Sequence, residues 1–195
     1  MEKKTKKNKF ELIAIIGKSA SGKNTILDEV LLSAEEPLHR VVQFTTRPKR
    51  PSEINYKDYI FLTQEEFNQK FTNDEILEVN FFRDWAYGTL ISTINPNIPN
   101  IGVFNPDAIL SLKETNLFDI KTYYIDASDK TRLLRSLTRQ DNPDVDEIIR
   151  RFLAEKKEHA DLSELEIKKT LTNEDDEDYD NCVEYILQAE CLKSN

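Results

Sequence analysis

The first clear pattern in the chain is a continuous apolar run from Leu12 to Ile16 that contains several β-branched residues. A short run of this kind is typical of a strand buried on both faces. A loop with a glycine at each end follows. After it, the segment 25–34 has apolar residues at positions 26, 27, 30 and 31, which is the spacing of one helical face. A strand, a loop and a helix in this order open a βαβ unit and predict an α/β protein with a parallel sheet.

Short apolar segments continue along the chain at spacings that favour alternating strands and helices. The further predicted strands cover residues 40–46, 59–62, 76–81, 101–104 and 122–126. The further predicted helices start at a capping motif at 63–67 and then cover 130–138, 145–161 and, after an acidic loop at 174–180, 182–191. The strands between residues 45 and 95 are closely spaced, which predicts an insert of different character from the rest of the fold.

The loop after the first strand, Gly17 to Asn24, fits the P-loop pattern G-x-x-x-x-G-K, but Asn24 follows where the pattern has Ser or Thr. Its glycines allow successive backbone N–H groups to point toward one anion, and the positive end of the following helix points to the same place. Lys23 would neutralise charge on the β and γ phosphates of a nucleotide. An ordinary strand-to-helix turn is the alternative interpretation.

Asn24 affects the expected metal site, because the hydroxyl usual at this position ligates Mg²⁺. An amide oxygen is a poorer substitute for that hydroxyl, although oxygen still suits this hard cation, and the neighbouring Thr25 can share or replace the role. Asn24 and Thr25 are therefore the candidate metal ligands. The candidate ATP-binding residues of the loop are Gly17, Ser19, Ser21, Gly22, Lys23, Asn24 and Thr25.

A second concentration of positive charge lies between Thr45 and Glu53, where Arg47, Lys49 and Arg50 occur among prolines that stiffen the segment. Arginine binds a phosphate through two parallel hydrogen bonds, so this segment is a candidate site for a second phosphate group. A solvated basic turn is the alternative interpretation.

Together with the P-loop, the order and spacing of these features resemble the guanylate kinase family over roughly residues 10–190. The family stretch T-T-R-x-x-R-x-G-E and a following D-Y are matched, with Ser52 in place of glycine, by Thr45, Thr46, Arg47, Arg50, Glu53, Asp58 and Tyr59. The later motifs are an I-E segment that leads into Y-G-[ST], two lid arginines, a third arginine and a V-N pair. They are matched by Leu77, Glu78, Tyr87, Gly88, Thr89, Arg135, Arg139, Arg151, Thr172 and Asn173.

The resemblance implies a kinase that transfers the γ-phosphoryl group of ATP to GMP or dGMP, with Mg²⁺ as the cofactor that accompanies ATP. The implied catalytic residues are Lys23, Arg47, Arg139 and Arg151. Arg135 and Asn173 are implied to contact ATP, and Glu78 and Thr89 to read the guanine. The implied GMP site consists of Gln43, Arg47, Arg50, Glu53, Tyr59, Glu78, Tyr87, Thr89 and Asn105.

Three further positions depart from the family pattern. Val103 and Asn105 stand where the family has two aspartates in D-x-D-x-Q-G, and Gln43 stands where a serine assists base binding. Together with Asn24, these changes bear on metal binding and on the fine detail of base choice. The arginines that would hold the phosphates are retained.

The resemblance also implies a single domain over residues 1–195 with three parts. The fold would be a P-loop kinase core with a parallel sheet, a small mixed-sheet insert that binds GMP, and a helical lid. The core would comprise residues 8–44, 99–127 and 160–195, the insert 45–98 and the lid 128–159.

Composition narrows the expected partners. A net charge of −9 argues against nucleic acid, because binding to phosphate backbones needs a basic surface. No apolar run reaches the length of about eighteen residues that a membrane span needs, and the apolar run after the basic start is too short for a signal peptide. We therefore expect a cytoplasmic protein, monomeric or homodimeric, whose partners are ATP and GMP or dGMP. Cys182 and Cys191 are expected to be reduced thiols.

Two other functions are compatible with parts of the pattern. A module of this fold that binds protein partners without catalysis has no need of Lys23 or of the lid arginines. A P-loop ATPase without a nucleotide acceptor leaves Arg47, Arg50, Glu78 and the tyrosines unexplained. Kinase activity is therefore the favoured hypothesis.

Overall fold

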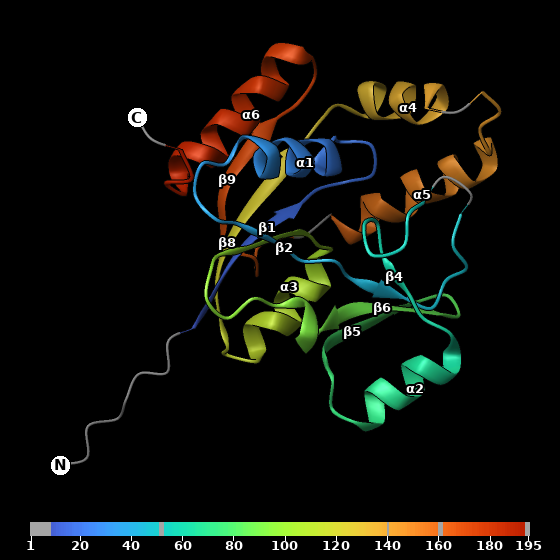
Figure 1. Ribbon diagram of the computed structural model, residues 1–195. Coiled ribbons are helices and arrows are strands. Elements are labelled where there is room, and N and C mark those ends of the chain that lie inside the picture. The colour runs from blue at the N-terminus through green and yellow to red at the C-terminus, as the bar shows by residue number, and fades with distance from the viewer. Residues whose placement is uncertain (1–8, 51–52, 140, 160–161, 194–195) are drawn as a thin grey trace.

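The apolar run near the start of the chain forms β1 (Phe10–Ile16), the central strand of a five-stranded sheet. Its other strands are β2 (His39–Arg40), β7 (Asn100–Val103), β8 (Phe118–Asp126) and β9 (Ile167–Thr172). They lie in the order β2-β7-β1-β8-β9, and every neighbouring pair is parallel (Figure 1). The predicted parallel sheet is confirmed.

The computed structural model describes residues 9–50, 53–139, 141–159 and 162–193. Ser52 and the expected helix end at residue 161 lie outside these ranges. Within these ranges, no helix has the length and apolar character of a membrane span. Cys182 is buried, Cys191 is exposed, and both are free thiols, as expected.

Helices cover both faces of the parallel sheet because the side chains of β1 alternate between the faces. Ile13 and Ile15 pack on one face in a buried cluster with α1 (Lys23–Ser33) and α6 (Asp176–Ala189). The alternate residues of β1 belong to a second buried cluster, which includes α3 (Pro106–Glu114). The sheet therefore forms the middle of three layers, and the P-loop follows β1 at its carboxyl edge.

The closely spaced strands form a separate four-stranded sheet. They are β3 (Phe44–Thr45), β4 (Ile60–Phe61), β5 (Ile76–Phe82) and β6 (Trp85–Leu90), in the order β4-β3-β6-β5. This sheet is mixed, because β3 pairs parallel with β4 and antiparallel with β6. A helix, α2 (Gln64–Thr72), packs on it through Phe67, and the predicted capping box forms between Thr63 and Glu66. The small mixed sheet is thus confirmed.

Two helices connect β8 to β9 and are called the helical pair here: α4 (Asp129–Thr138) and α5 (Val145–Glu158). The helical pair contacts the mixed sheet, since the Arg150 guanidinium of α5 lies 5.3 Å from the ring centroid of Phe82 in β5. It also contacts the P-loop, as described below. The helical pair therefore contacts both the mixed sheet and the loop that follows β1; Figure 1 shows where the two helices lie.

Several predicted boundaries are wrong. The single strand predicted at 40–46 is two strands in different sheets, β2 and β3, because the chain leaves the first sheet between them. The acidic segment predicted as a loop at 174–180 begins α6, whose N-cap Asp175 accepts a hydrogen bond from the Asp178 N–H. Acidic residues are favourable in the first turn of a helix, because they face its positive end. Three elements, β6, α3 and β9, were not predicted, nor was the short 3₁₀ turn Ile91–Thr93.

Candidate active site

The two P-loop glycines occupy backbone conformations and spaces that other residues do not fit. Gly17 has φ +148° and Gly22 has φ +95°, in the region that L side chains rarely adopt. A Cβ on Gly17 would lie 2.3 Å from the carbonyl oxygen of Ile125, and one on Gly22 would lie 2.2 Å from Nδ2 of Asn173. The loop therefore curls tightly against β8 and against the residue that follows β9.

Asn173 holds the P-loop in this position. Its Nδ2 donates to the Ser21 carbonyl oxygen at 2.7 Å, and its backbone N–H donates to the Asp126 carbonyl oxygen at 2.8 Å. Its Oδ1 and the Ser21 hydroxyl oxygen are buried without a hydrogen-bond partner among the described residues. Buried polar atoms without partners are rare, and here two of them lie at the same loop.

Beside this loop lies a hollow of about 380 Å³, within the usual range for small-molecule sites. It is lined by Gly22, Thr25, Arg135, Asn173, Asp175, Asp176 and Tyr179. Arg135 reaches it from α4 and donates to the Asn173 carbonyl oxygen at 2.9 Å. The hollow therefore brings together four of the residues predicted to bind ATP.

Lys23 begins α1, and its Nζ donates to the Lys18 carbonyl oxygen at 2.9 Å across the P-loop. Asn24 and Thr25 follow in the first turn of α1, where both side chains are exposed. Within the described residues there is no group of three or more His, Cys, Asp or Glu side chains that could hold a metal ion. The neutral oxygens of Asn24 and Thr25 suit Mg²⁺ only when phosphate oxygens and water complete its shell.

The predicted second phosphate site is built around Glu53. Its carboxylate accepts two hydrogen bonds from the guanidinium of Arg47, at 2.7 and 3.0 Å, and a third from the backbone N–H of Arg50 at 2.7 Å. Arg47 is buried and Arg50 is exposed. Glu53 therefore orients the arginines that would hold a phosphate, and its own contact with GMP stays a prediction.

Further cationic and aromatic groups meet at Arg50. Partial desolvation, followed by the charges of Arg151 and Arg47, lowers the pKa of Arg50. Tyr59 and Tyr87 lie edge to face, with ring centroids 6.0 Å apart, and the Arg47 guanidinium lies 5.8 Å from the Tyr59 ring centroid. Arg151 comes from α5, where it donates to Glu147 at 2.8 Å. A concentration of like charges that repel one another is stabilised when an anion binds among them.

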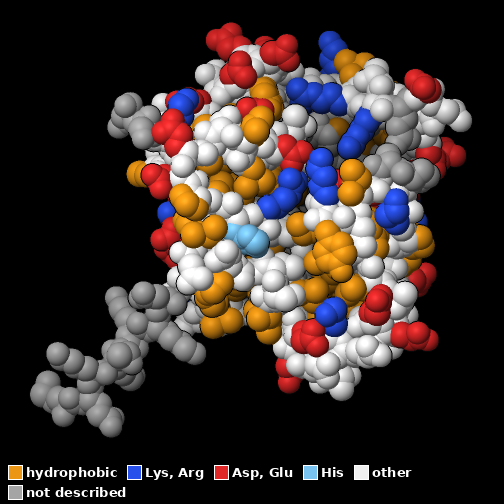
Figure 2. All heavy atoms as spheres, in the orientation of Figure 1, with side chains coloured by type: hydrophobic (Ala, Val, Ile, Leu, Met, Phe, Trp, Pro, Cys, Tyr) orange, Lys and Arg blue, Asp and Glu red, His pale blue; other side chains and the backbone are white. Residues whose placement is uncertain are grey.

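Figure 2 shows the surface of the molecule in the orientation of Figure 1. Lys and Arg side chains gather near the middle of the face that it displays.

The predicted base-reading residues lie together on the mixed sheet. Glu78 in β5 and Thr89 in β6 are directly opposite in the strand register, and the Thr89 hydroxyl donates to Glu78 at 2.7 Å. Nε2 of Gln43 donates to Glu78 at 3.3 Å, and Nδ2 of Asn80 donates to its other oxygen at 3.0 Å. Glu78 is only 5% exposed, and this burial raises its pKa to about 7 although Thr89 and Gln43 oppose the shift.

Among the described residues, no contact joins two of the predicted site residues, Asn105 and Arg139, to these clusters. Asn105 caps α3, where its Oδ1 accepts from the Ala108 N–H at 2.7 Å. Arg139 is exposed at the C-terminal end of α4. Sequence reasoning also missed Asn80, whose position two residues after Glu78 on one strand places both side chains on the same face of the sheet.

Comparison with known proteins decides the family. A family model described as guanylate kinase matches residues 9–190. The chain belongs to the guanylate kinase family. Its relatives include the guanylate kinase of Thermotoga maritima, 37% identical over 116 residues, which are 60% of this chain and 54% of that protein. Another is the guanylate kinase of Malacoplasma penetrans, 40% identical over 94 residues, 48% of this chain and 47% of that protein.

These matched regions span about half the length of the curated relatives. A crystal structure of guanylate kinase from Anaplasma phagocytophilum superimposes with a TM-score of 0.63 over 96% of this chain and 89% of that one. The two sequences are 22% identical, so this likeness concerns the fold. The likeness is consistent with the fold described above, in which a five-stranded parallel sheet is accompanied by a separate small mixed sheet.

Proposed function

We propose that this guanylate kinase family member transfers the γ-phosphoryl group of ATP to GMP or dGMP. The observation that carries the proposal is a P-loop together with an arginine cluster around Glu53 and a buried carboxylate, Glu78, on the mixed sheet. A P-loop alone is consistent with an ATPase, but the cluster of Arg47, Arg50 and Arg151 has no role there. The buried pair of Glu78 and Thr89 suits a base, because guanine presents two adjacent donors to a carboxylate.

Phosphoryl transfer needs two anions held in line and positive charge around the transferring group, with little covalent chemistry from the protein. The P-loop N–H groups and Lys23 would hold the phosphates of ATP, and Arg135 and Asn173 would line the space for its base. Arg47, Arg50 and Arg151 would hold the phosphate of GMP. This phosphate is ionised at pH 7, so no general base is required.

In this proposal the chain divides as the sequence suggests, into a core (8–44, 99–127 and 160–195), a GMP-binding insert (45–98) and a lid (128–159). Arg151 of the lid already lies near Arg50 of the insert. Closure of these two parts over the nucleotides would exclude water, which otherwise competes for the phosphoryl group.

Asn24 and Thr25 would hold Mg²⁺ together with the phosphates of ATP and water. When bound, the ion supplies positive charge to oxygens of the β and γ phosphates. Because the Asn24 amide stands in place of the hydroxyl that is usual at this position, we expect Asn24→Ser to lower the Mg²⁺ concentration that gives half-maximal rate severalfold. The measurement is a Mg²⁺ titration of the rate at fixed total ATP. An unchanged midpoint in Asn24→Ser would contradict the assigned metal position.

Glu78 makes GMP binding depend on pH. Its pKa of about 7 in the ligand-free protein means that the carboxyl is increasingly protonated below pH 7. Guanine donors need the ionised form, so the affinity for GMP should fall by about tenfold for each pH unit below 7 and level off above it. Calorimetric titrations between pH 5.5 and 8.5 measure this slope.

The phosphate of GMP also titrates near pH 6, so the matched control is Glu78→Gln, which keeps that contribution. Its weaker GMP affinity should change less steeply over the same range. An equal slope in the two proteins would show that Glu78 does not carry the pH dependence.

The proposed activity is tested by the release of ADP from ATP and Mg²⁺ with and without GMP. Release that requires GMP or dGMP supports the kinase. Equal release without an acceptor would indicate an ATPase. No release although GMP binds would indicate a module that has lost catalysis.

A further inference from the structure

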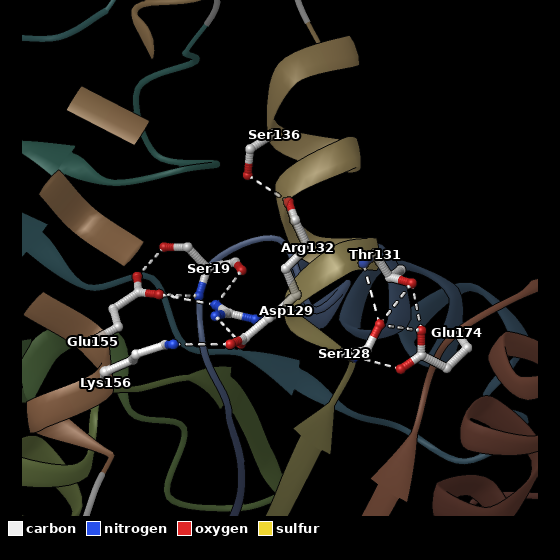
Figure 3. Close-up of polar contacts among 9 residues, drawn as sticks. All are labelled: Ser19, Ser128, Asp129, Thr131, Arg132, Ser136, Glu155, Lys156 and Glu174. Carbon is white, nitrogen blue, oxygen red and sulfur yellow. Dashed lines mark hydrogen bonds and ion pairs between the residues drawn. The ribbon is translucent and has the colours of Figure 1, made fainter. Parts of the chain in front are cut away.

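A carboxylate of the helical pair sits on the P-loop (Figure 3). The backbone N–H of Ser19 donates to Oε2 of Glu155 at 2.9 Å, and the Ser19 hydroxyl donates to Oε1 of the same side chain. Glu155 lies on α5 and Ser19 lies in the loop between β1 and α1. A negatively charged group of the chain therefore occupies N–H and O–H donors of a loop whose expected ligand is a phosphate.

A buried arginine completes this arrangement. Arg132 of α4 is 1% exposed, and its Nη1 donates to the Ser19 carbonyl oxygen at 3.1 Å and to Glu155 at 3.2 Å. Its Nη2 donates to Asp129 at 3.1 Å. Its Nε is buried without a hydrogen-bond partner among the described residues. Arg132 thus contacts the P-loop through Nη1 and has an unused donor in Nε, and it matches none of the family motifs found in the sequence.

Carboxylate and phosphate oxygens are equivalent acceptors for these donors, and arginine binds either of them through charge-assisted hydrogen bonds. A buried arginine needs an anionic partner, because an unpaired buried charge is costly. Asp129 is half-exposed and already pairs with Lys156, so Glu155 is the more buried anion beside Arg132. The N–H and O–H donors of Ser19 and the guanidinium of Arg132 therefore form an anion subsite, and the Glu155 carboxylate fills it.

We propose that Ser19 and Arg132 form a phosphate subsite which Glu155 occupies in the ligand-free protein and which a phosphate oxygen of ATP occupies after exchange. This inference rests on the proposed use of the P-loop for ATP. Arg132 is then an additional phosphate-binding residue, and Glu155 is an internal competitor that holds α5 on the loop until the nucleotide arrives. The displacement of Glu155 releases α5, so that ATP binding is coupled to the position of the lid.

An internal competitor reduces the apparent affinity for its rival by the fraction of molecules in which the site is free. Hydrogen bonds to charged groups are stronger than neutral ones, so a neutral amide in place of the Glu155 carboxylate should free the site. We therefore expect Glu155→Gln to bind ATP about tenfold more tightly, or better, than the unmodified protein. Removal of a carboxylate elsewhere should not have this effect.

The experiment is a calorimetric titration of three proteins with ATP and with inorganic tripolyphosphate. The proteins are the unmodified chain, Glu155→Gln and the control Glu166→Gln, which makes the same charge change at an exposed side chain paired with Lys113. Tighter binding of both probes by Glu155→Gln, with no gain in the control, supports the subsite. A gain with ATP alone, or an equal gain in the control, would overturn it, because competition at a phosphate subsite must act on both probes.

A purely structural role for Glu155 gives a different result. Glu155→Gln would then lower the thermal unfolding midpoint and leave the affinity for tripolyphosphate unchanged or weaker, which would overturn the inference. The proposed function would survive that result, provided that the unmodified protein binds ATP and Lys23→Ala weakens the binding. If the unmodified protein and Glu155→Gln both bind neither probe, the P-loop assignment and the subsite fail together.

Arg132 has its own test in the background of the Glu155→Gln variant. Arg132→Lys keeps the charge but loses the planar fork, so the gain in tripolyphosphate affinity should largely disappear. Circular dichroism and thermal unfolding establish that this double variant is folded. A folded double variant that keeps the full gain would remove Arg132 from the subsite.

Discussion

Replacement of Lys23 by alanine should lower the rate of ADP formation by about a thousandfold or more and leave the fold intact. Lys23 lies at the start of α1 and reaches across the P-loop to the Lys18 carbonyl oxygen, so its ammonium group is held where phosphate charge would develop. Interactions that strengthen in the transition state act mainly on turnover. The rate of a single turnover with saturating ATP and GMP measures the effect.

The matched control is Lys113→Ala, which removes an exposed lysine paired with Glu166. It should keep the full rate, and both variants should unfold at temperatures close to that of the unmodified protein. A Lys23→Ala protein that forms ADP at nearly the normal rate would refute the role assigned to the P-loop.

The second large effect concerns the base of the acceptor. At pH 8, where Glu78 is ionised, GMP and dGMP should be phosphorylated and AMP should not. Guanine offers N1–H and its amino group to one carboxylate, whereas adenine offers an acceptor at N1. A buried charge left without a partner costs about 2–3 kcal/mol, on the order of a hundredfold in selectivity.

Glu78→Gln should therefore lose most of its GMP affinity and keep its ATP affinity, because the P-loop lies in a different part of the fold. Thr89 and Gln43, which donate to Glu78 in the ligand-free protein, would remain available to the base. The control is Glu75→Gln, a nearby half-buried carboxylate that pairs with Lys70. Calorimetry with GMP on the three proteins measures the difference. Equal GMP affinities in Glu78→Gln and the unmodified protein would mean that Glu78 does not read the base.

Much of the fold could be predicted because its signals are local. The run from Leu12 to Ile16 has no polar interruption, so only a fully buried strand fits it. The capping motif at Thr63 and the two P-loop glycines act within a few residues, and each forms as predicted. The sequence signal for each of these features lies within a few neighbouring residues, which is why sequence reasoning finds them.

Features that depend on distant partners could not be predicted. The segment 40–46 contains no strand-breaking residue, so nothing local shows that β2 and β3 belong to different sheets. The pairing of Glu155 with Ser19 joins residues 136 positions apart, and no periodicity or motif marks either partner for the other.

The proposed reaction requires that one protein molecule binds ATP and GMP together and transfers a phosphoryl group from ATP to GMP. The most direct measurement mixes the protein with ATP, Mg²⁺ and GMP and quantifies ADP and GDP together by chromatography. One GDP should form for each ADP, and neither product should appear when GMP is replaced by AMP. ADP without GDP, or bound GMP that is never converted, would contradict the proposed reaction.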